Sequence, residues 1–219
     1  MLKVSIIVSN MEHPVYTVMK EWVDNNSHID AEIVNSTKEL RDYGEFLFLV
    51  SCTDIINQGI RDRFRNCLVL HASDLPKGRG WSPHIWEIIN GNNMLTLSLL
   101  EAEDKVDSGR IWLKTEVNLD GSELFDEINN KLFTAELELI QRAVNQYETI
   151  IPYEQDSEIS PYYFPKRGPE DSRININDSI LDQFNLLRVC DSERFPAFFE
   201  LNGQRYAIKL EKVESGNEK

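Results

Sequence analysis

The chain carries a histidine and an aspartate, His71 and Asp107, where side chains can take part in acid–base chemistry. His71 ends a short apolar run that begins at Cys67 and leads into a loop rich in proline and glycine. Open α/β folds usually keep their chemistry where a buried strand ends in such a loop. Asp107 lies in a polar connection between two strand-like runs, and a carboxylate can orient or charge a histidine. Taken alone, His71 is more simply interpreted as a hydrogen-bonded histidine at the end of a strand, and Asp107 as a turn residue.

The loop after His71 can approach an anionic ligand. It reads PKGRGWSP over residues 76–83. Its glycines let the backbone come close to a ligand, and Lys77 and Arg79 can meet phosphate or carboxylate. The plainer interpretation, a rigid connection from a strand to a helix, is compatible with this role.

These segments resemble the folate-dependent formyltransferase family, whose core motif reads roughly Asn-x-His-x-Ser-x-Leu-Pro, then Arg-Gly-x-x-Pro, then Asp-x-Gly. The matching residues are His71, Ser73, Leu75, Pro76, Arg79, Gly80, Pro83, Asp107 and Gly109. The spacing from His71 to Asp107, 107 − 71 = 36 positions, also agrees with the family pattern. The resemblance implies that His71 and Asp107 are catalytic, that 10-formyltetrahydrofolate is the formyl donor, and that no metal takes part.

The same resemblance implies the residues that contact the ligands. Toward the folate it implies Ser73, Leu75, Pro76, Glu103, Asp104 and Val106, with the loop 102–106 receiving the pteridine largely through backbone groups. Toward the second substrate it implies Lys77, Arg79, Gly80 and Trp81.

One position departs from the family motif. The asparagine expected two residues before the histidine is replaced by Val69. Asn66 lies three positions too early, and an odd displacement on a strand moves a side chain to the other face. We therefore expect another donor near the formyl oxygen, with Ser73, Asn92 and Asn93 as candidates. His71 acting alone and a non-catalytic family member remain the alternatives.

A second motif, YYFPKRGPEDSRI at residues 162–174, bears on the second substrate. It is similar to a segment of sugar formyltransferases that act on nucleotide-linked amino sugars, through Tyr163, Phe164, Pro165, Lys166, Arg167, Pro169, Glu170, Asp171 and Ile174. Aromatic faces can stack on a base, and Lys or Arg can engage a diphosphate. The resemblance therefore implies substrate binding by Tyr163, Phe164, Lys166 and Arg167. A structural loop that pins the C-terminal part to the core is the alternative.

Composition limits the partners and the compartment. The chain has 23 basic and 37 acidic residues, which gives a net charge of −14. This charge repels a polyanion and argues against tRNA as a partner. The cysteines, Cys52, Cys67 and Cys190, lack metal-ligand spacing and favour reduced thiols. The first residues lack the features of a signal peptide, and no run is long enough to cross a bilayer. We expect a cytoplasmic protein with no nucleic-acid or membrane partner.

Strand and helix patterns alternate along the chain and predict an α/β fold: a Rossmann-like core with a mainly parallel sheet, plus a small C-terminal helix and β-hairpin. We expect the core at 1–150, a substrate-loop and hairpin extension at 151–213, and a flexible tail at 214–219. Predicted strands are 2–8, 29–34, 45–52, 67–70, an antiparallel pair at 94–101 and 110–119, and a hairpin at 195–199 and 205–210. Predicted helices are 15–25, 54–64, 82–90, a long one starting at Ser122 with a capping box and ending at Tyr147, and one at 177–188 capped by Asn177 or Asp178. Residues 162–174 are expected to be an ordered loop.

Within the resembling family, the nucleotide-sugar branch fits best. Methionyl-tRNA formyltransferases carry a further basic domain, glycinamide ribonucleotide transformylases place a glycine-rich phosphate loop after the first strand, and formyltetrahydrofolate hydrolases carry a regulatory domain. None of these features is found here. The motif after His71 is also similar to the branch found with nonulosonic (pseudaminic-type) acid biosynthesis. A non-catalytic folate- or nucleotide-binding module and a formyltransferase for another amine stay open, and the resemblance favours a homodimer.

Overall fold

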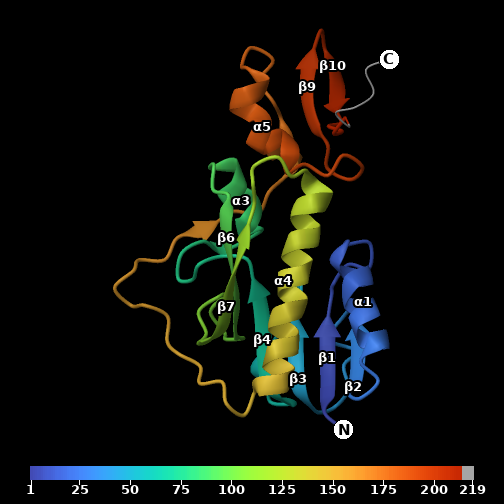
Figure 1. Cartoon of the computed structure of the whole chain (residues 1–219), viewed down its shortest axis with the longest axis vertical. Coiled ribbons are helices and arrows are strands. Elements are labelled where there is room, and N and C mark those ends of the chain that lie inside the picture. Colours follow the sequence, from blue (N-terminus) through green and yellow to red (C-terminus); the bar gives the residue numbers. More distant parts are fainter. Residues whose placement is uncertain (214–219) are drawn as a thin grey trace.

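Six strands form the central sheet of the computed structural model, which describes residues 1–213 (Figure 1). Their spatial order is β2-β1-β3-β4-β6-β7. The first four run parallel, whereas β6 is antiparallel to both β4 and β7. The strands are β1 (Lys3–Ile7), β2 (Asp30–Val34), β3 (Gly44–Leu49), β4 (Phe64–His71), β6 (Met94–Glu101) and β7 (Ile111–Asn118). The predicted mainly parallel sheet with an antiparallel pair is confirmed, and the predicted tail 214–219 lies outside the described residues.

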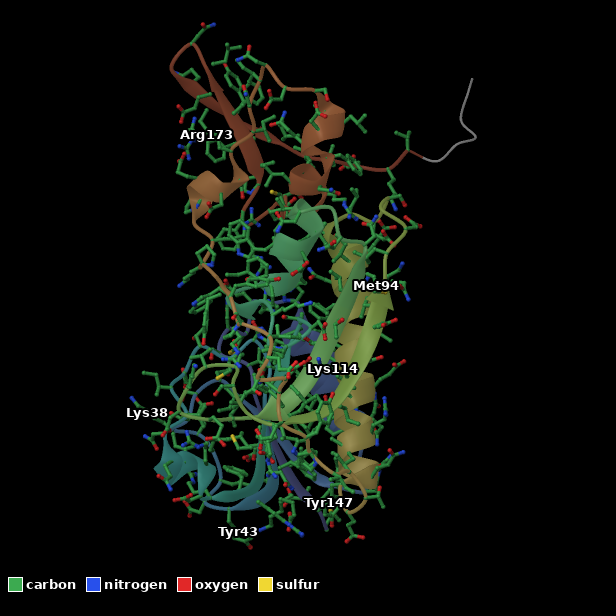
Figure 2. The ribbon with its side chains drawn as sticks, turned by 90° about the vertical axis from the view of Figure 1, so that its left-hand side faces the viewer. Lys38, Tyr43, Met94, Lys114, Tyr147 and Arg173 are labelled. Atoms are coloured by element: carbon green, nitrogen blue, oxygen red, sulfur yellow. The ribbon has the colours of Figure 1, made fainter. Side chains whose placement is uncertain are left out.

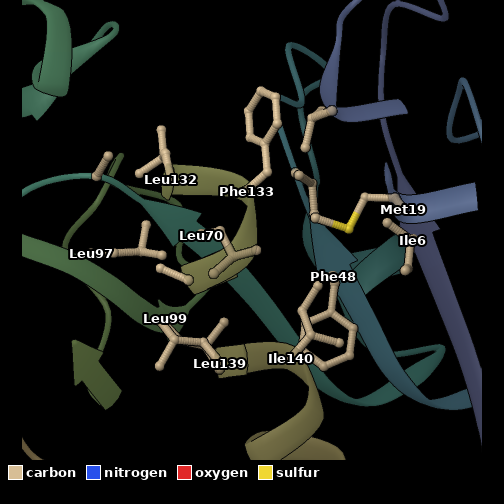
Figure 3. Packing of buried hydrophobic residues seen from close by; sticks show 14 of the residues in the cluster. Ile6, Met19, Phe48, Leu70, Leu97, Leu99, Leu132, Phe133, Leu139 and Ile140 are labelled. Carbon is tan, nitrogen blue, oxygen red and sulfur yellow. The ribbon is translucent and has the colours of Figure 1, made fainter. Parts of the chain in front are cut away.

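The main apolar core lies on one face of this sheet. Two long helices, α1 (Val15–Asn25) and α4 (Phe125–Gln146), pack against that face (Figure 1). Because successive side chains of a strand point to opposite sides, alternate residues reach this layer. Figure 3 shows Phe48 of β3 and Leu70 of β4 among the apolar side chains of α4, including Leu139. The core thereby fixes the direction in which β4 carries His71.

The opposite face of the sheet has little helical cover, and the helix predicted over 54–64 is wrong in extent. Only α2 (Gln58–Arg61) forms there. The Asn57 side chain accepts a hydrogen bond from the Ile60 amide (3.1 Å), which is an N-cap that starts the helix at this point. Since β4 already begins at Phe64, the helix has no room to extend.

The long helix α4 begins later than the pattern at Ser122 predicted. Its N-cap residue is Leu124, whose amide donates to the Glu127 carboxylate at 2.8 Å. The Ser122 amide instead donates to Asp120 in the turn before the helix (2.7 Å). The carboxylate half of a capping box is therefore present, but two residues further along the chain. Helix α3 (Pro83–Ile89) matches its prediction, and Gly91, in the left-handed region with φ 94°, follows its end.

The C-terminal extension adds three small units to the end of the core at which the strands of the parallel sheet finish (Figure 1). A short strand β8 (Tyr163–Phe164) and a 3₁₀ helix (Pro169–Ser172) lie within the segment that was expected to be a loop. Helix α5 (Ile180–Arg188) is capped by Ser179, not by Asn177 or Asp178. The hairpin of β9 (Ala197–Leu201) and β10 (Gln204–Ile208) is confirmed, with positive φ angles of 52° and 75° at Asn202 and Gly203.

A buried arginine attaches α5 to the core. The Arg188 guanidinium donates to the Asn93 side-chain oxygen (2.7 Å) and lies 3.8 Å from the Glu123 carboxylate. Glu123 in turn pairs with Lys131 of α4 at 2.5 Å. A buried charge needs such partners, so this contact fixes how the extension sits on the core.

The three cysteines are free, and burial raises the pKa of the Cys67 thiol to about 12, so this thiol stays protonated.

Over residues 1–213, none of the helices has the length and apolar character needed to cross a bilayer. Within the same residues, His, Cys, Asp and Glu side chains form no cluster suited to a metal ion.

One carboxyl group lies inside the core without a partner. Glu136 belongs to the buried side of α4, and its helical neighbours three and four positions away are all buried: Leu132, Phe133, Leu139 and Ile140. Its Oε2 atom has no hydrogen-bond partner within the described residues. Burial raises the pKa of Glu136 to about 8, so the folded protein holds this group in its protonated form at neutral pH.

We expect Glu136→Gln to stabilise the protein increasingly as the pH rises from 4.5 to about 8. Because the folded-state pKa is raised, the wild type loses stability across this window as the unfolded chain releases the proton, whereas the amide does not titrate. The gain should be smallest at pH 4.5 and roughly 2–4 kcal/mol at pH 8, measured by urea unfolding. Glu138→Gln, exposed on the same helix, is the control. Parallel stability curves for wild type and Glu136→Gln would contradict the prediction.

Candidate active site

The structure brings His71 and Asp107 together. His71 is the last residue of β4, and Asp107 lies in the connection between β6 and β7. Their side chains are 7% and 8% exposed, and His71 Nδ1 lies 3.6 Å from Asp107 Oδ1. His71 Nε2 lies 2.9 Å from the Gly78 carbonyl oxygen, so it donates a hydrogen bond there. The two residues thus form a buried pair at the end of the parallel part of the sheet.

The hydrogen bond to Gly78 defines the chemistry of the pair. A neutral imidazole that keeps its proton on Nε2 presents an unprotonated Nδ1 to the Asp107 carboxylate. Two acceptors cannot form a hydrogen bond with each other, but at 3.6 Å the carboxylate attracts the imidazole once Nδ1 is protonated. A proton that arrives at Nδ1 is stabilised by the carboxylate. The pair can therefore take up a proton during a reaction.

Asp107 is held in an unusual backbone conformation. Its φ angle of 53° lies in the left-handed region, which side chains rarely adopt. The Gly80 amide donates to its Oδ2 (2.9 Å), and the Gln155 side-chain amide donates to its carbonyl oxygen (2.9 Å). Gly109 is also required nearby, because a Cβ atom there would lie 2.0 Å from the Glu101 carbonyl oxygen. The surrounding structure therefore determines the direction of the Asp107 carboxylate.

The two sequence motifs lie side by side. Residues Arg79–Gly80 form β5, which pairs in parallel with β8, aligning Arg79 with Tyr163 and Gly80 with Phe164. Gly80 has φ 97°, and a Cβ atom on it would lie 2.5 Å from the Phe164 carbonyl oxygen. Only glycine permits this approach. The segment expected to bind the second substrate is thereby joined to the strand whose amide holds Asp107.

Arg79 and Gly80 differ from their expected role in contacting substrate. Arg79 is 6% exposed, and its guanidinium donates to the Gln155 side-chain oxygen at 2.6 Å. The pairing of β5 with β8 covers it, so its charge faces the protein interior. Gly80 uses its amide for Asp107. Both residues support the acid–base pair, whereas Lys77, between His71 and β5, is exposed.

The position of the missing asparagine is occupied by apolar packing. Val69, on the same face of β4 as His71, packs with Leu75, Leu100 and Ile111. Asn66 lies at the start of β4 and donates to the Glu45 carbonyl oxygen (3.2 Å), so it cannot replace the asparagine. Two of the three candidate donors already donate elsewhere, and the third is engaged through its acceptor oxygen. Ser73 donates to the Lys77 carbonyl, the Asn92 side chain donates to Glu87, and the Asn93 side chain accepts from Arg188.

The residues expected to contact folate fall into two groups. Ser73, Leu75 and Pro76 are buried in the loop after β4, so their side chains shape that loop. Figure 2 shows Lys114 near the middle of the molecule; its ammonium group donates to Asp74 (2.6 Å) and to the Leu75 carbonyl (2.9 Å). These bonds fix the loop against β7.

The second group lies on the β6–β7 connection and is exposed: Glu103, Asp104 and Val106. The Asp104 carboxylate pairs with Arg61 at 2.6 Å, which ties the connection to α2. Val106 is 60% exposed and lies one residue before Asp107. An exposed apolar side chain next to the acid–base pair suits contact with a planar heterocycle.

Aromatic rings gather where β5, α3 and β8 meet, in what we call the aromatic shelf: Trp81, Trp86, Tyr162, Tyr163 and Phe164. Trp86 and Phe164 stack with their centroids 6.1 Å apart, and Tyr162 meets Phe164 edge-on at 5.2 Å. The Trp86 indole donates to the Pro165 carbonyl oxygen (3.0 Å). This packing holds β8 against α3.

The two cations of the second motif lie in different surroundings. Lys166 is exposed, and its ammonium group lies 4.8 Å from the Trp81 ring centroid. Trp81 itself is 43% exposed. The half-buried Arg167 donates to the Asp171 carbonyl oxygen (2.9 Å), which closes the turn around the 3₁₀ helix. Lys166 is therefore available to a ligand, whereas Arg167 supports the fold of its own segment.

Sequence reasoning missed Gln155 and His84. Gln155 lies in the polar stretch after α4 that was interpreted only as a boundary, and no motif marked it. His84 begins α3, and its Nδ1 is buried without a hydrogen-bond partner within the described residues. Burial, together with repulsion from His13, His71 and Arg167, lowers the pKa of His84 to about 4. His84 is thus a neutral imidazole near the acid–base pair.

The mostly parallel sheet has a Rossmann-like arrangement, with a histidine at the end of β4 and an aspartate beside it. A family model described as "Formyl transferase" matches residues 5–144, and the chain belongs to this family. Its members use formyl-tetrahydrofolate. The family implied by the sequence resemblance is therefore confirmed.

Individual relatives differ in their described substrates. The methionyl-tRNA formyltransferase of Thermodesulfovibrio yellowstonii is 30% identical over 188 residues, covering 84% of this chain and 60% of that protein. The chain spans three fifths or less of the length of the curated relatives that it matches. The methionyl-tRNA formyltransferase structure from Clostridium thermocellum has a TM-score of 0.79 at 22% identity, covering 99% of this chain and 95% of that one. A sugar N-formyltransferase structure from Shewanella has a TM-score of 0.72 at 17% identity, covering 98% and 100%.

We expect His71→Ala and Asp107→Ala each to lower the turnover number for formyl transfer by about 10²-fold or more, because positioned acid–base groups contribute on that scale. Circular dichroism and thermal unfolding should show a folded protein in both cases. His28→Ala, at an exposed position, is the control and should keep wild-type turnover. Near-normal turnover in a folded variant would remove that residue from the mechanism.

Proposed function

We propose that the chain is an N-formyltransferase that moves a formyl group from 10-formyltetrahydrofolate to the amine of a nucleotide-linked amino sugar. The observation that carries the proposal is the pairing of β5 with β8. It joins the aromatic shelf and Lys166 to the strand whose Gly80 amide binds Asp107. A substrate that rests on the shelf is thus next to a buried acid–base pair. The expected cytoplasmic location is part of this proposal.

The reaction follows from the chemistry of the pair. The amine nitrogen attacks the formyl carbon, and the carbonyl oxygen gains the electron pair. As the new C–N bond forms, the amine loses a proton, which His71 Nδ1 accepts under the influence of the Asp107 carboxylate. When the intermediate collapses, the bond to N10 of the folate breaks, and the same proton passes to that nitrogen. The Nε2–H of His71 lies on the opposite edge of the ring and donates to the Gly78 carbonyl oxygen, so it is not free for the developing oxyanion while Nδ1 accepts the proton.

The hydrogen-bond donor for the oxyanion must lie at a position other than residue 69, where Val69 replaces the asparagine of the family motif. An apolar side chain there offers no hydrogen bond, and removing one oxyanion donor typically costs on the order of 10²–10³ in rate. His84 supports this part of the proposal, because its Nδ1 is buried without a partner and its imidazole is neutral near His71. In its Nδ1–H tautomer, His84 can donate a hydrogen bond that the family asparagine would otherwise supply.

The second substrate is inferred from the shelf. The rings of Trp81 and Tyr163 are exposed and can stack on a nucleobase, while Lys166 can neutralise a phosphate. The net charge of −14 opposes a long polyanion more strongly than a single diphosphate.

A second candidate acceptor is methionyl-tRNA. The 30% identity to a methionyl-tRNA formyltransferase over most of the chain favours it. A single-turnover assay with 10-formyltetrahydrofolate, a panel of nucleotide-linked amino sugars, and methionyl-tRNA separates the candidates. Formylation of a sugar supports the proposal, and formylation of the tRNA alone overturns it. Binding of folate without transfer to any acceptor points to a non-catalytic module.

Lys166→Ala should raise the KM for the nucleotide-linked sugar about tenfold and leave the KM for 10-formyltetrahydrofolate unchanged. The variant loses one charge-assisted contact to the phosphate of the sugar substrate. Binding of the formyl donor does not use this contact. Steady-state kinetics with each substrate varied in turn measure both constants. Lys38→Ala, which lies far from the Arg173 end of the molecule (Figure 2), is the matched control. Equal changes in both KM values would point to a structural role for the loop.

We also expect a homodimer. Apolar side chains of the extension remain exposed, with Leu181 of α5 at 84%, and Ile180, Phe195 and Tyr206 also exposed. Phe198 is buried and Phe199 stacks on Tyr206, so the hairpin only partly covers its own aromatic residues. Exposed apolar patches on an extension favour association. Light scattering across a wide concentration range should give twice the chain mass, whereas a constant monomer mass would exclude the dimer.

A further inference from the structure

The amide side chain of Gln155 joins the substrate side of the site to the catalytic aspartate. Its Nε2 donates to the carbonyl oxygens of Asp107 and Gly109, each at 2.9 Å. Its Oε1 accepts from Arg79 at 2.6 Å. These bonds use the amide NH₂ group and its oxygen to link Gln155 to two segments that are distant in sequence, residues 107–109 and Arg79. None of these bonds involves a reacting group directly.

We propose that Gln155 is a positioning residue for catalysis. It holds the Asp107 backbone in the left-handed conformation that directs the carboxylate toward His71, and Arg79 holds Gln155 in turn. The proposal rests on the formyl-transfer function proposed above.

Arg79 determines which way the Gln155 amide points. An arginine can only donate hydrogen bonds, so the atom facing it must be the amide oxygen. The NH₂ group is then turned toward Asp107 and Gly109, which offer only carbonyl oxygens. The burial of Arg79 prevents water from replacing this contact.

The backbone at Asp107 needs such support. A non-glycine residue at φ 53° is strained, and the strain persists only where neighbouring groups fix the conformation. The Gly80 amide fixes the carboxylate end of the residue, and Gln155 fixes the carbonyl end. Without Gln155, the peptide after Asp107 can rotate, and the carboxylate moves relative to His71.

The same network reaches the second substrate. Arg79 also donates to the Tyr163 hydroxyl at 3.4 Å, and Tyr163 is exposed on the aromatic shelf. Strands β5 and β8 carry both residues in register. Through Arg79, Gln155 is therefore connected to the shelf that we propose for the second substrate.

The first test is a kinetic comparison. Gln155→Ala should lower the turnover number 10- to 100-fold while each KM changes less than about twofold, because neither substrate touches Gln155. Gln155→Glu has nearly the same shape, keeps an acceptor for Arg79 and cannot donate to the carbonyl oxygens, so it should behave alike even if the alanine variant folds poorly. Gln204→Ala, on the exposed hairpin, is the control. Wild-type turnover in Gln155→Glu would overturn the proposal.

The second test separates positioning from general structural support. In an Asp107→Ala background, adding Gln155→Glu should change the residual turnover less than threefold, since there is no carboxylate left to position. Additive losses would overturn the proposal. Amide hydrogen exchange over residues 102–110 should rise at least tenfold in Gln155→Glu, and unchanged exchange would also overturn it. If the wild type transfers no formyl group, the proposed function fails, while the exchange measurement still tests the role of Gln155.

Discussion

The hydrogen bond from the Gly80 amide to the Asp107 carboxylate links the His71–Asp107 pair to the strand that pairs with β8. It can form only because a glycine at position 80 allows β5 to approach β8, where any Cβ atom would collide with the Phe164 carbonyl oxygen. The acid–base pair, the folate-side connection and the aromatic shelf all meet at this contact. A two-residue strand thus places the segment that we propose to bind substrate next to the Asp107 carboxylate.

The His71–Asp107 pair is built for proton movement but not closed by a hydrogen bond. The 3.6 Å separation and the proton on Nε2 leave Nδ1 ready to accept. Catalytic contacts are often long in ligand-free structures and tighten when substrate binds, so this separation is consistent with an acid–base role. The rigid support beneath the pair, from Gly80 and Gln155, keeps the carboxylate aligned for that step.

Val69 makes this chain a variant within its family. Where the motif calls for an amide, the structure has a small apolar cluster with Leu75, Leu100 and Ile111. This cluster stabilises the loop after β4 but leaves one side of the site without a polar group. The neutral His84 near the pair, whose Nδ1 is buried without a partner in the described residues, is the donor that we propose in place of the amide.

Sequence alone determined the α/β class of the fold and indicated which histidine and aspartate would lie together. Runs such as β1, β3 and β4 are apolar enough to require burial, and the spacing of His71, Ser73, Pro76 and Asp107 matched one family. Sequence did not determine the parts that depend on contacts between distant segments. The motif at residues 162–174 was expected to be a loop, because nothing local predicts a two-residue strand whose partner lies about eighty positions away. Arg79 was expected to bind substrate, because an arginine in a glycine-rich loop has no local reason to be buried. Only the pairing of β5 with β8 turned it inward toward Gln155, since hydrogen-bond partners and burial are properties of the tertiary structure.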